Sequence, residues 1–517
     1  LLQPGTLAGA LLVSSEDPSG EFSNSDRQLV EIQAEMAKRM LQSCYDPLTG
    51  LMTRNPFEYR FRQQLDQQQA TLLLFHCNHF KLITDTFGSE ASNRLLQLFS
   101  DILQNTVPKG SLISRLDTDE FAVAIESAVD SIITSGIKKE AFPGAQLLVA
   151  KQGEVIFHKA YGHHTYDSIK AVGLHDRYDL ASVTKITAAL PALMKLYEEG
   201  LIELDVPFSN YWKPWKHRKD KRDLSLREIL SHQAGLTPYI VFLNEVMRKG
   251  KLKKRFVRKQ PSEKFSLRAY ENLYVNERFQ RKMYRMINRS KVSSDKTYRY
   301  SGLAFLLFPK VISDLSGQSY AYFLKKHFYL PMGALTLDFN PELTYFQNPL
   351  VPTERDTVYR RALTQGWVHD ENASLMGGIS GNAGLFGTAG DLAKMMQMYQ
   401  NYGYYAGQQY LKKETLEQFT AVQFPENDNR RGLGFDKPLL DNQNLTLGEA
   451  YPAPEVSQES FGHSGFTGTF VWADPKYQLV FIFLSNRVYP YRTHRQLYDL
   501  NIRPALQQVF YKALLQD

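Results

Sequence analysis

The stretch that decides the fold reads Asp-Leu-Ala-Ser-Val-Thr-Lys over residues 179–185, and an apolar helical pattern follows it from Ile186 to Tyr197. A Ser and a Lys three positions apart at the start of a helix project from one face. The helix dipole and the free backbone N–H groups there favour negative charge, which suits a nucleophilic oxygen. Lys185 is then placed to take the proton of Ser182. The bland alternative is a capping Ser followed by a surface Lys, and this tetrapeptide alone favours that alternative.

A second motif reads Tyr-Arg-Tyr-Ser-Gly over residues 298–302 and leads into the apolar run 303–311. A tyrosine beside a nucleophile can serve as a general base when nearby cations favour its phenolate, and Tyr300 is the candidate. The alternative is an aromatic side chain packed in the core at the start of a helix. Taken by itself, this motif also favours the structural interpretation.

A third motif, Gly-His-Ser-Gly-Phe-Thr-Gly-Thr over residues 462–469, precedes two apolar runs that predict a pair of strands, 470–472 and 479–484. A glycine-rich strand edge lets a substrate approach the backbone and can supply an N–H group to an oxyanion. We expect His463 to donate a hydrogen bond or to titrate near neutral pH. The alternative is a glycine-rich hairpin with a histidine that faces solvent.

Each motif is weak, but their order and spacing together resemble the penicillin-recognising serine hydrolases, in the branch of class C β-lactamases, D-Ala-D-Ala carboxypeptidases and esterases. The resemblance covers residues 129–517. It implies an α+β fold of the β-lactamase/transpeptidase type, in which an antiparallel sheet is flanked by helices and joined by a helical subdomain.

The resemblance also implies the roles of the site residues. Ser182 attacks an acyl carbon and forms a covalent ester, while Lys185 and Tyr300 share the general-acid and general-base work. The backbone N–H groups of Ser182 and Phe466 form the oxyanion hole, and Ser464 and Gly465 lie along the substrate.

Two positions depart from the pattern of many relatives. His463 replaces a Lys, which resembles the esterase side of the family. Gly302 stands where many relatives have Asn or Asp, so it can neither hydrogen-bond a substrate amide nor hold Lys185. This departure puts β-lactam or peptide turnover in doubt more than ester cleavage. The substrate class therefore stays open between an ester, an amide, a β-lactam and a peptidoglycan-derived peptide.

Residues 41–126 resemble a GGDEF domain, the diguanylate cyclase family, through the motif 46–51, the strand 71–75 and the strand pair 113–125. The residues that would carry the chemistry are replaced. His76 stands for a metal-binding Asp, Thr84 and Asn93 stand for guanine contacts, and the two signature glycines are Asp117 and Thr118. Two such side chains, one of them negative, would repel a nucleotide. We therefore expect no diguanylate cyclase activity from this α/β unit.

The N-terminal organisation is incomplete. Residues 1–40 resemble the last strand and helix of a GAF domain, and the GGDEF-like unit ends at residue 126 without its remaining elements. One hypothesis is a recombined or mis-assembled open reading frame, and another is an inactive signalling or scaffold fusion. The chain opens without Met, and we see no signal peptide in it.

Composition adds few constraints. A net charge of +7 is modest for 517 residues, although eight of the twelve residues 248–259 are Lys or Arg. We interpret this segment as a solvated surface insertion rather than a nucleic-acid or membrane patch, and we expect no nucleic-acid partner. No apolar run reaches transmembrane length. The histidines lack ligand spacing, so we predict no metal and no cofactor. The sequence indicates neither the oligomeric state nor the compartment.

Overall fold

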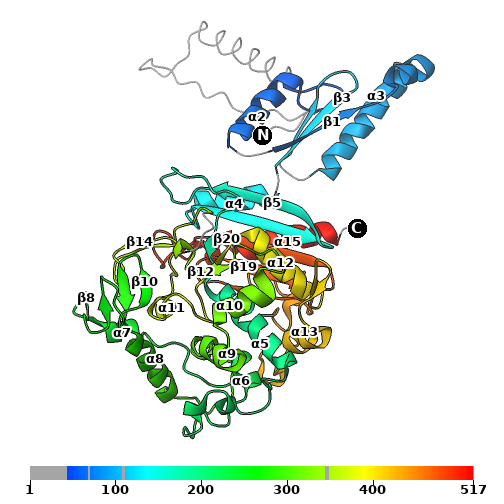
Figure 1. Ribbon diagram of the computed structural model, residues 1–517. Coiled ribbons are helices and arrows are strands. Elements are labelled where there is room, and N and C mark those ends of the chain that lie inside the picture. Colours follow the sequence, from blue (N-terminus) through cyan, green and yellow to red (C-terminus); the bar gives the residue numbers. More distant parts are fainter. Residues whose placement is uncertain (1–43, 68–69, 108–110, 127, 344–347, 516–517) are drawn as a thin grey trace, which may run out of the picture. The chain divides into compact units, whose positions relative to one another are not determined.

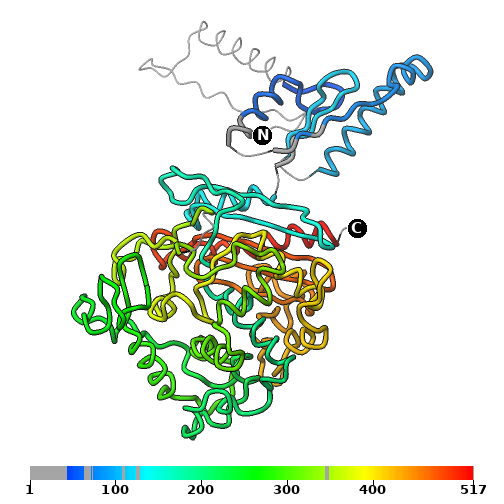
Figure 2. Tube along the Cα trace, in the orientation of Figure 1, coloured from blue at the N-terminus to red at the C-terminus, as the bar shows by residue number. Residues whose placement is uncertain are grey.

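The computed structural model describes residues 44–67, 70–107, 111–126, 128–343 and 348–515, and the chain divides into two compact units, Leu1–Ser131 and Ile132–Asp517. Figures 1 and 2 show the elements of each unit. The predicted GAF-like tail, residues 1–40, lies outside the described residues.

The N-terminal unit is built on a three-stranded antiparallel sheet in the order β1–β3–β2. Its elements are α2 (Arg54–Gln67), β1 (Ala70–His76), α3 (Phe80–Thr106), β2 (Leu112–Arg115) and β3 (Glu120–Glu126). The predicted strand at 71–75 and the predicted strand pair at 113–125 are therefore confirmed. Phe121 and Val123 alternate with Ala122 along β3, and both pack against Leu96 and Leu103 of α3.

The larger unit is organised around a five-stranded antiparallel sheet in the order β18–β19–β20–β4–β5. These strands are β4 (Gly144–Lys151), β5 (Glu154–Gly162), β18 (Phe461–Ser464), β19 (Phe470–Asp474) and β20 (Leu479–Ser485). The chain thus pairs its N-terminal hairpin with its C-terminal strands. β18 lies at one edge of the sheet, so the third motif occupies an edge strand.

Successive side chains of β20 enter two different cores, as expected for a strand buried on both faces. Val480 and Ile482 join the large apolar core that includes α12 (Ala389–Gln400). Phe481 and Phe483 face the other way, where they contact Phe510 of α15 (Ile502–Leu514) and Phe142. The sheet therefore lies between two helical layers (Figure 1).

The helical subdomain shares one continuous apolar core with the five-stranded sheet. Its main helices are α5 (Leu190–Glu198), α6 (Leu226–Leu230), α9 (Phe308–Ser316), α10 (Tyr320–Leu324), α11 (Glu371–Leu375) and α13 (Lys413–Thr420). The antiparallel sheet, its flanking helices and this subdomain confirm the predicted α+β architecture. No helix in the described ranges is both long and apolar enough to cross a bilayer.

The basic segment, residues 248–259, lies mostly at the surface, as predicted. This segment and the residues that follow form β7 (Met247–Arg248), β8 (Lys251–Leu252), β9 (Val257–Arg258), β10 (Leu267–Tyr270), β11 (Leu273–Val275) and α8 (Glu277–Arg289). Helix α8 buries Phe279, Met283 and Ile287 at a helical spacing. Its opposite face exposes four arginines: Arg278, Arg281, Arg285 and Arg289.

Candidate active site

The segment that carries Ser182 is fixed at its start by a small sheet. Strand β6 (Tyr178–Asp179) pairs with β15 (Leu385–Gly387), and the Leu180 N–H donates to the Leu385 carbonyl at 3.0 Å. The buried carboxylate of Asp179 then accepts from the Ala181 N–H at 2.8 Å. Ala181 adopts a φ of 45°, which is uncommon for a residue with a side chain. The nucleophile thus follows a sharp, strained turn.

The helix after Ser182 begins irregularly, with a 3₁₀ turn at Ala181–Val183 and a π turn at Lys185–Ala189 before α5. Pro191 has no N–H, so it bonds neither the Ile186 carbonyl five residues earlier nor the Thr187 carbonyl four residues earlier. Two buried tyrosine hydroxyls donate to these same carbonyls, Tyr399 to Ile186 at 2.6 Å and Tyr329 to Thr187 at 2.8 Å. The core therefore stabilises the irregular turn that presents the nucleophile.

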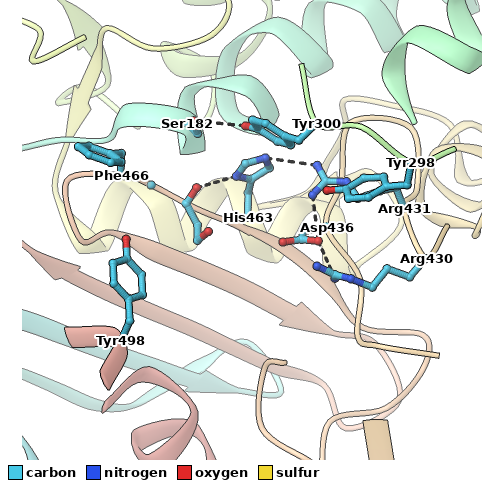
Figure 3. Close-up of a pocket in the computed structure, with 11 residues that line it drawn as sticks. Ser182, Tyr298, Tyr300, Arg430, Arg431, Asp436, His463, Phe466 and Tyr498 are labelled. Carbon is cyan, nitrogen blue, oxygen red and sulfur yellow. Dashed lines mark hydrogen bonds and ion pairs between the residues drawn. The ribbon is translucent and has the colours of Figure 1, made fainter. Parts of the chain in front are cut away.

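The structure brings the first two motifs together. Lys185 Nζ lies 2.8 Å from Ser182 Oγ and also donates to the Asn382 carbonyl at 3.1 Å. The Tyr300 hydroxyl donates to Ser182 Oγ at 3.4 Å, as Figure 3 shows. Lys185 is buried, and its Nζ lies 5.3 Å from the centre of the Tyr300 ring. The serine oxygen is therefore in contact with both proposed proton carriers.

The Tyr300 ring packs against His232, a neutral histidine. The His232 and Tyr300 rings lie 4.4 Å apart, and His232 Nδ1 accepts from the Ser301 N–H at 3.3 Å. Burial, together with the charges of Arg431 and Lys185, lowers the pKa of His232 well below its usual value. His232 therefore orients Tyr300 without adding charge. The sequence predicted no role for it.

The third motif lies against the nucleophile turn. Thr467 donates through its hydroxyl to the Asp179 carbonyl at 2.7 Å, and Thr469 donates to the Leu180 carbonyl at 3.1 Å. Gly465 packs so closely that an added Cβ would lie 2.6 Å from the Leu180 carbonyl oxygen. The turn between β18 and β19 thus needs glycine there, because no side chain fits. Phe466 follows it at the rim and is half exposed.

Of the two alternatives for His463, the structure supports the hydrogen-bond donor and not a group that titrates near neutral pH. Burial, Arg431 and Lys185 lower the pKa of His463 to about 3. Its Nδ1 lies 2.7 Å from the Ser464 carbonyl, which can only accept, so Nδ1 carries the proton. Nε2 is left as an acceptor and lies 3.4 Å from Arg431 Nη2. The histidine does not face solvent either, because it is buried.

A cluster that the sequence did not predict completes the site. Arg430 and Arg431 both pair with one carboxylate oxygen of Asp436, at 2.6 and 2.9 Å. Burial opposes ionisation of Asp436, but the two arginines more than compensate and hold its pKa below the usual range. The only signal in the sequence is a pair of arginines before Gly-Leu-Gly-Phe-Asp at 432–436, which no chemical spacing rule singles out.

These groups surround one cavity of about 270 Å³. It is lined by Ser182, Tyr298, Tyr300, Arg430, Arg431, Asp436, His463, Ser464, Gly465, Phe466 and Tyr498. In Figure 3, Ser182 and Tyr300 face each other, and His463 lies beside Arg431. The residues predicted to bind substrate thus share one pocket with the nucleophile.

Gly302 lies beside this site, and there is open space where its side chain would be. A Cβ added to it would have one close neighbour, the Cβ of Asn382 at 4.0 Å. The contact to Lys185 comes instead from the backbone carbonyl of Asn382. Within the described ranges, no group of three or more His, Cys, Asp or Glu is arranged to hold a metal ion.

The fold and the Ser-Lys-Tyr geometry define a serine acyl hydrolase with an α+β architecture. The family described as "Beta-lactamase" matches residues 129–503, and the chain belongs to this family. It is 30% identical over 373 residues to the "Putative D-alanyl-D-alanine carboxypeptidase" of Salmonella typhimurium (strain LT2), covering 67% of this chain and 79% of the relative. It is 27% identical over 399 residues to the "N-acetylmuramyl-L-alanine amidase" of Bacillus subtilis (strain 168), covering 72% and 84%.

Solved structures agree on the fold. EstCE1, a hydrolase with promiscuous acyltransferase activity, superposes with a TM-score of 0.53 at 18% identity, covering 73% of this chain and 97% of that one. A class C β-lactamase from Rhodobacter sphaeroides gives 0.52 at 15% identity, covering 74% and 99%. The chain is thus a serine hydrolase of the β-lactamase and penicillin-binding-protein type.

A second family, described as "Diguanylate cyclase, GGDEF domain", matches residues 43–168. Its last 40 residues overlap the hydrolase match. In the structure this overlap forms α4 (Ala128–Lys138), β4 and β5, and both strands belong to the five-stranded sheet. In the GGDEF-like unit, His76 Nε2 lies 3.4 Å from a carboxylate oxygen of Asp119. The absence of cyclase activity remains a prediction.

Proposed function

We propose that this chain hydrolyses an ester or amide of a small acyl donor through a covalent acyl-Ser182 intermediate. The observation that carries the proposal is the contact of one serine oxygen with two proton carriers, Lys185 at 2.8 Å and Tyr300 at 3.4 Å. A hydroxyl needs such a base to attack an acyl carbon at neutral pH.

In the first half-reaction, the Ser182 hydroxyl gives its proton to the Lys185–Tyr300 pair while Oγ bonds to the carbonyl carbon. The carbonyl oxygen becomes an oxyanion, and we assign its stabilisation to the N–H groups of Ser182 and Phe466. The intermediate then collapses, the leaving group takes up the transferred proton, and the acyl-serine remains. Water repeats the sequence in the second half, which releases the acid and restores the hydroxyl.

A second candidate substrate is a peptidoglycan-derived peptide. The pocket is lined by Arg430 and Arg431 against the single acid Asp436, and His463 is neutral. This excess of positive charge favours an anionic acyl donor, such as a peptide with a free carboxylate. The names of the carboxypeptidase and amidase relatives agree with this class. A β-lactam belongs to the same candidate, since it also carries a carboxylate.

The test compares the full chain with its Ser182→Ala variant on p-nitrophenyl butyrate, a D-Ala-D-Ala peptide and a fluorescent penicillin. Each active substrate should lose at least about 10³-fold in kcat/KM in the variant. Intact-mass spectrometry should find the acyl adduct on wild type and none on the variant. Equal activity of the two proteins would contradict the role of Ser182. A folded wild type without activity or adduct would favour the alternative of an inactive scaffold.

A further inference from the structure

The positive charge near Tyr300 has an unexpected origin. The third motif contributes His463, which burial, Arg431 and Lys185 keep uncharged above a pKa of about 3. Arg431 comes from a different segment and is fully buried, yet its guanidinium carbon lies 5.6 Å from the centre of the Tyr300 ring. Figure 3 shows the Arg431 guanidinium beside His463, joined to it by a dashed line.

The hydrogen bonds fix which group gives and which accepts. Since His463 Nδ1 donates to the Ser464 carbonyl, Nε2 offers a lone pair, and Arg431 Nη2 can donate to it at 3.4 Å. A guanidinium cannot act as an acceptor, so this contact needs the neutral histidine. Arg431 therefore selects one tautomer of His463 while keeping its own charge.

Arg431 is anchored through Asp436 to β18, the strand that carries His463. Its Nη1 pairs with Asp436 at 2.9 Å. The Asp436 N–H donates to the Gly462 carbonyl at 2.8 Å, and the Gly462 N–H donates back at 3.0 Å. Gly462 directly precedes His463 in β18, so the carboxylate that holds the guanidinium is attached to the edge of the active-site strand. This arrangement leaves Arg431 little freedom to move.

The groups around Tyr300 come from several segments. Lys185 and Ser182 lie at the start of the helix that carries the nucleophile. His232 lies in the loop after α6, and His463 lies in β18. Tyr298 belongs to the same motif as Tyr300. His232 and His463 both have pKa values well below their usual range, so they are neutral at working pH. Arg431 is the cation that approaches the Tyr300 ring from the side of His463, and Asp436 carries the countercharge that Arg431 shares with Arg430.

We propose that Arg431 is a positioning residue that supplies, through Tyr300, the positive charge that the third motif of this chain lacks. The guanidinium stabilises the phenolate that forms when Tyr300 releases its proton to water, so that the phenolate can then take the proton of Ser182. It also holds His463 as an acceptor. The inference rests on the proposed function, because it assigns Tyr300 a part in proton transfer. It also explains how a histidine can stand at position 463, where many relatives use a lysine.

The test is the pH profile of kcat/KM for p-nitrophenyl butyrate with the full chain, once Ser182→Ala has established that the activity depends on Ser182. Without Arg431 the phenolate forms less readily, so in Arg431→Gln the acid-side pH of half-maximal kcat/KM should rise by about one unit, with about a tenfold loss at pH values well below both midpoints. Arg222→Gln is the control. It removes an exposed arginine and its ion pair to Asp223 outside the pocket lining, and its half-maximal pH should stay at the wild-type value.

A rescue separates charge from structure. Arg431→Gln combined with His463→Lys returns one cation to the same side of Tyr300, so the half-maximal pH should move back toward wild type. A purely structural role for the Arg431–Asp436 pair predicts no such return. An unshifted profile in Arg431→Gln overturns the proposal.

If Arg431→Gln does not fold, His463→Asn supplies the second test. The proposal predicts that the acid-side half-maximal pH of this variant equals that of wild type, because His463 neither gains nor loses a proton at working pH. A half-maximal pH that moves in His463→Asn would mean that the histidine titrates, and the proposal would fail. Equal hydrolysis by wild type and by Ser182→Ala would instead contradict the proposed function. This result is distinct from a failure of the Arg431 proposal.

Discussion

The open space at Gly302 makes the substrate range testable with one residue. A Cβ at this position would lie 4.0 Å from the Cβ of Asn382, an ordinary contact distance, and Gly302 does not need a positive φ. We expect Gly302→Asn to fold with an unfolding free energy within about 1 kcal/mol of wild type, because replacing glycine also restricts the unfolded chain. The added amide should raise the rate of acylation by a fluorescent penicillin, while butyrate ester hydrolysis changes little. Slower penicillin acylation in a folded variant would show that Gly302 does not limit this reaction. Gly302→Ala controls for the Cβ alone.

Lys437 predicts a stability effect of pH in the hydrolase unit. Burial lowers the pKa of Lys437 to about 8, although Asp474 and Glu459 favour its charged form. Since the unfolded chain keeps the proton up to a higher pH, it binds more protons than the folded state between about pH 8 and 10.5, so stability should rise across this window. Relative to Lys437→Met, the unfolding free energy of wild type should increase by roughly 3 kcal/mol from pH 7 to 10.5.

Urea unfolding at several pH values measures this difference. All four tryptophans lie between positions 212 and 472, so their fluorescence reports on the hydrolase unit. The exposed Lys476→Met variant controls for the loss of one charge. A wild-type minus Lys437→Met difference that stays flat with pH would contradict the burial argument.

At the scale of the element, the turn after Ser182 depends on two hydroxyls far away in the sequence. Tyr399→Phe removes the donor to the Ile186 carbonyl and leaves a buried acceptor without that partner. We expect a loss of about 1–3 kcal/mol in unfolding free energy and a lower kcat, because Lys185 begins the π turn. Tyr404→Phe, at an exposed tyrosine, is the control and should behave as wild type. Wild-type stability in Tyr399→Phe would mean that the carbonyl finds another donor.

The same element shows where sequence reasoning reaches its limit. The pattern from Ile186 to Tyr197 predicts a helix, and a helical segment is present, because apolar spacing reports which face is buried. Pro191 signals a disturbed backbone, yet the π turn and its tyrosine partners at 329 and 399 depend on contacts across more than 130 positions. Local propensity contains no information on such partners.

At the scale of the whole molecule, the order of the sequence motifs predicted the architecture better than it predicted the charges of the active-site residues. Motifs in a fixed order indicated the α+β hydrolase, and the structure brings Ser182, Lys185 and Tyr300 into contact. The neutral state of His463 could not be predicted, because it follows from burial beside Arg431, which lies 32 positions earlier and belongs to no motif. Electrostatic environment is a property of the packed site rather than of a short pattern.

The domain division near residue 129 is still a prediction, and helix α4 offers a sharp test of it. Gly136 packs so tightly that an added Cβ would lie 2.8 Å from Ile502 of α15, and Ile133 is fully buried. The helix therefore contributes to the layer behind the five-stranded sheet, although the division between the two compact units falls within it.

We expect a fragment of residues 128–517 to fold with wild-type esterase activity. A fragment of residues 139–517 should lose several kcal/mol and precipitate or unfold, since truncating one buried Ile already costs about 2–5 kcal/mol. Ile133→Ala in the full chain separates the lost packing from the truncation, and it should be destabilised without loss of solubility. If the shorter fragment is as stable as the longer one, α4 does not belong to the hydrolase core, and the boundary lies after it.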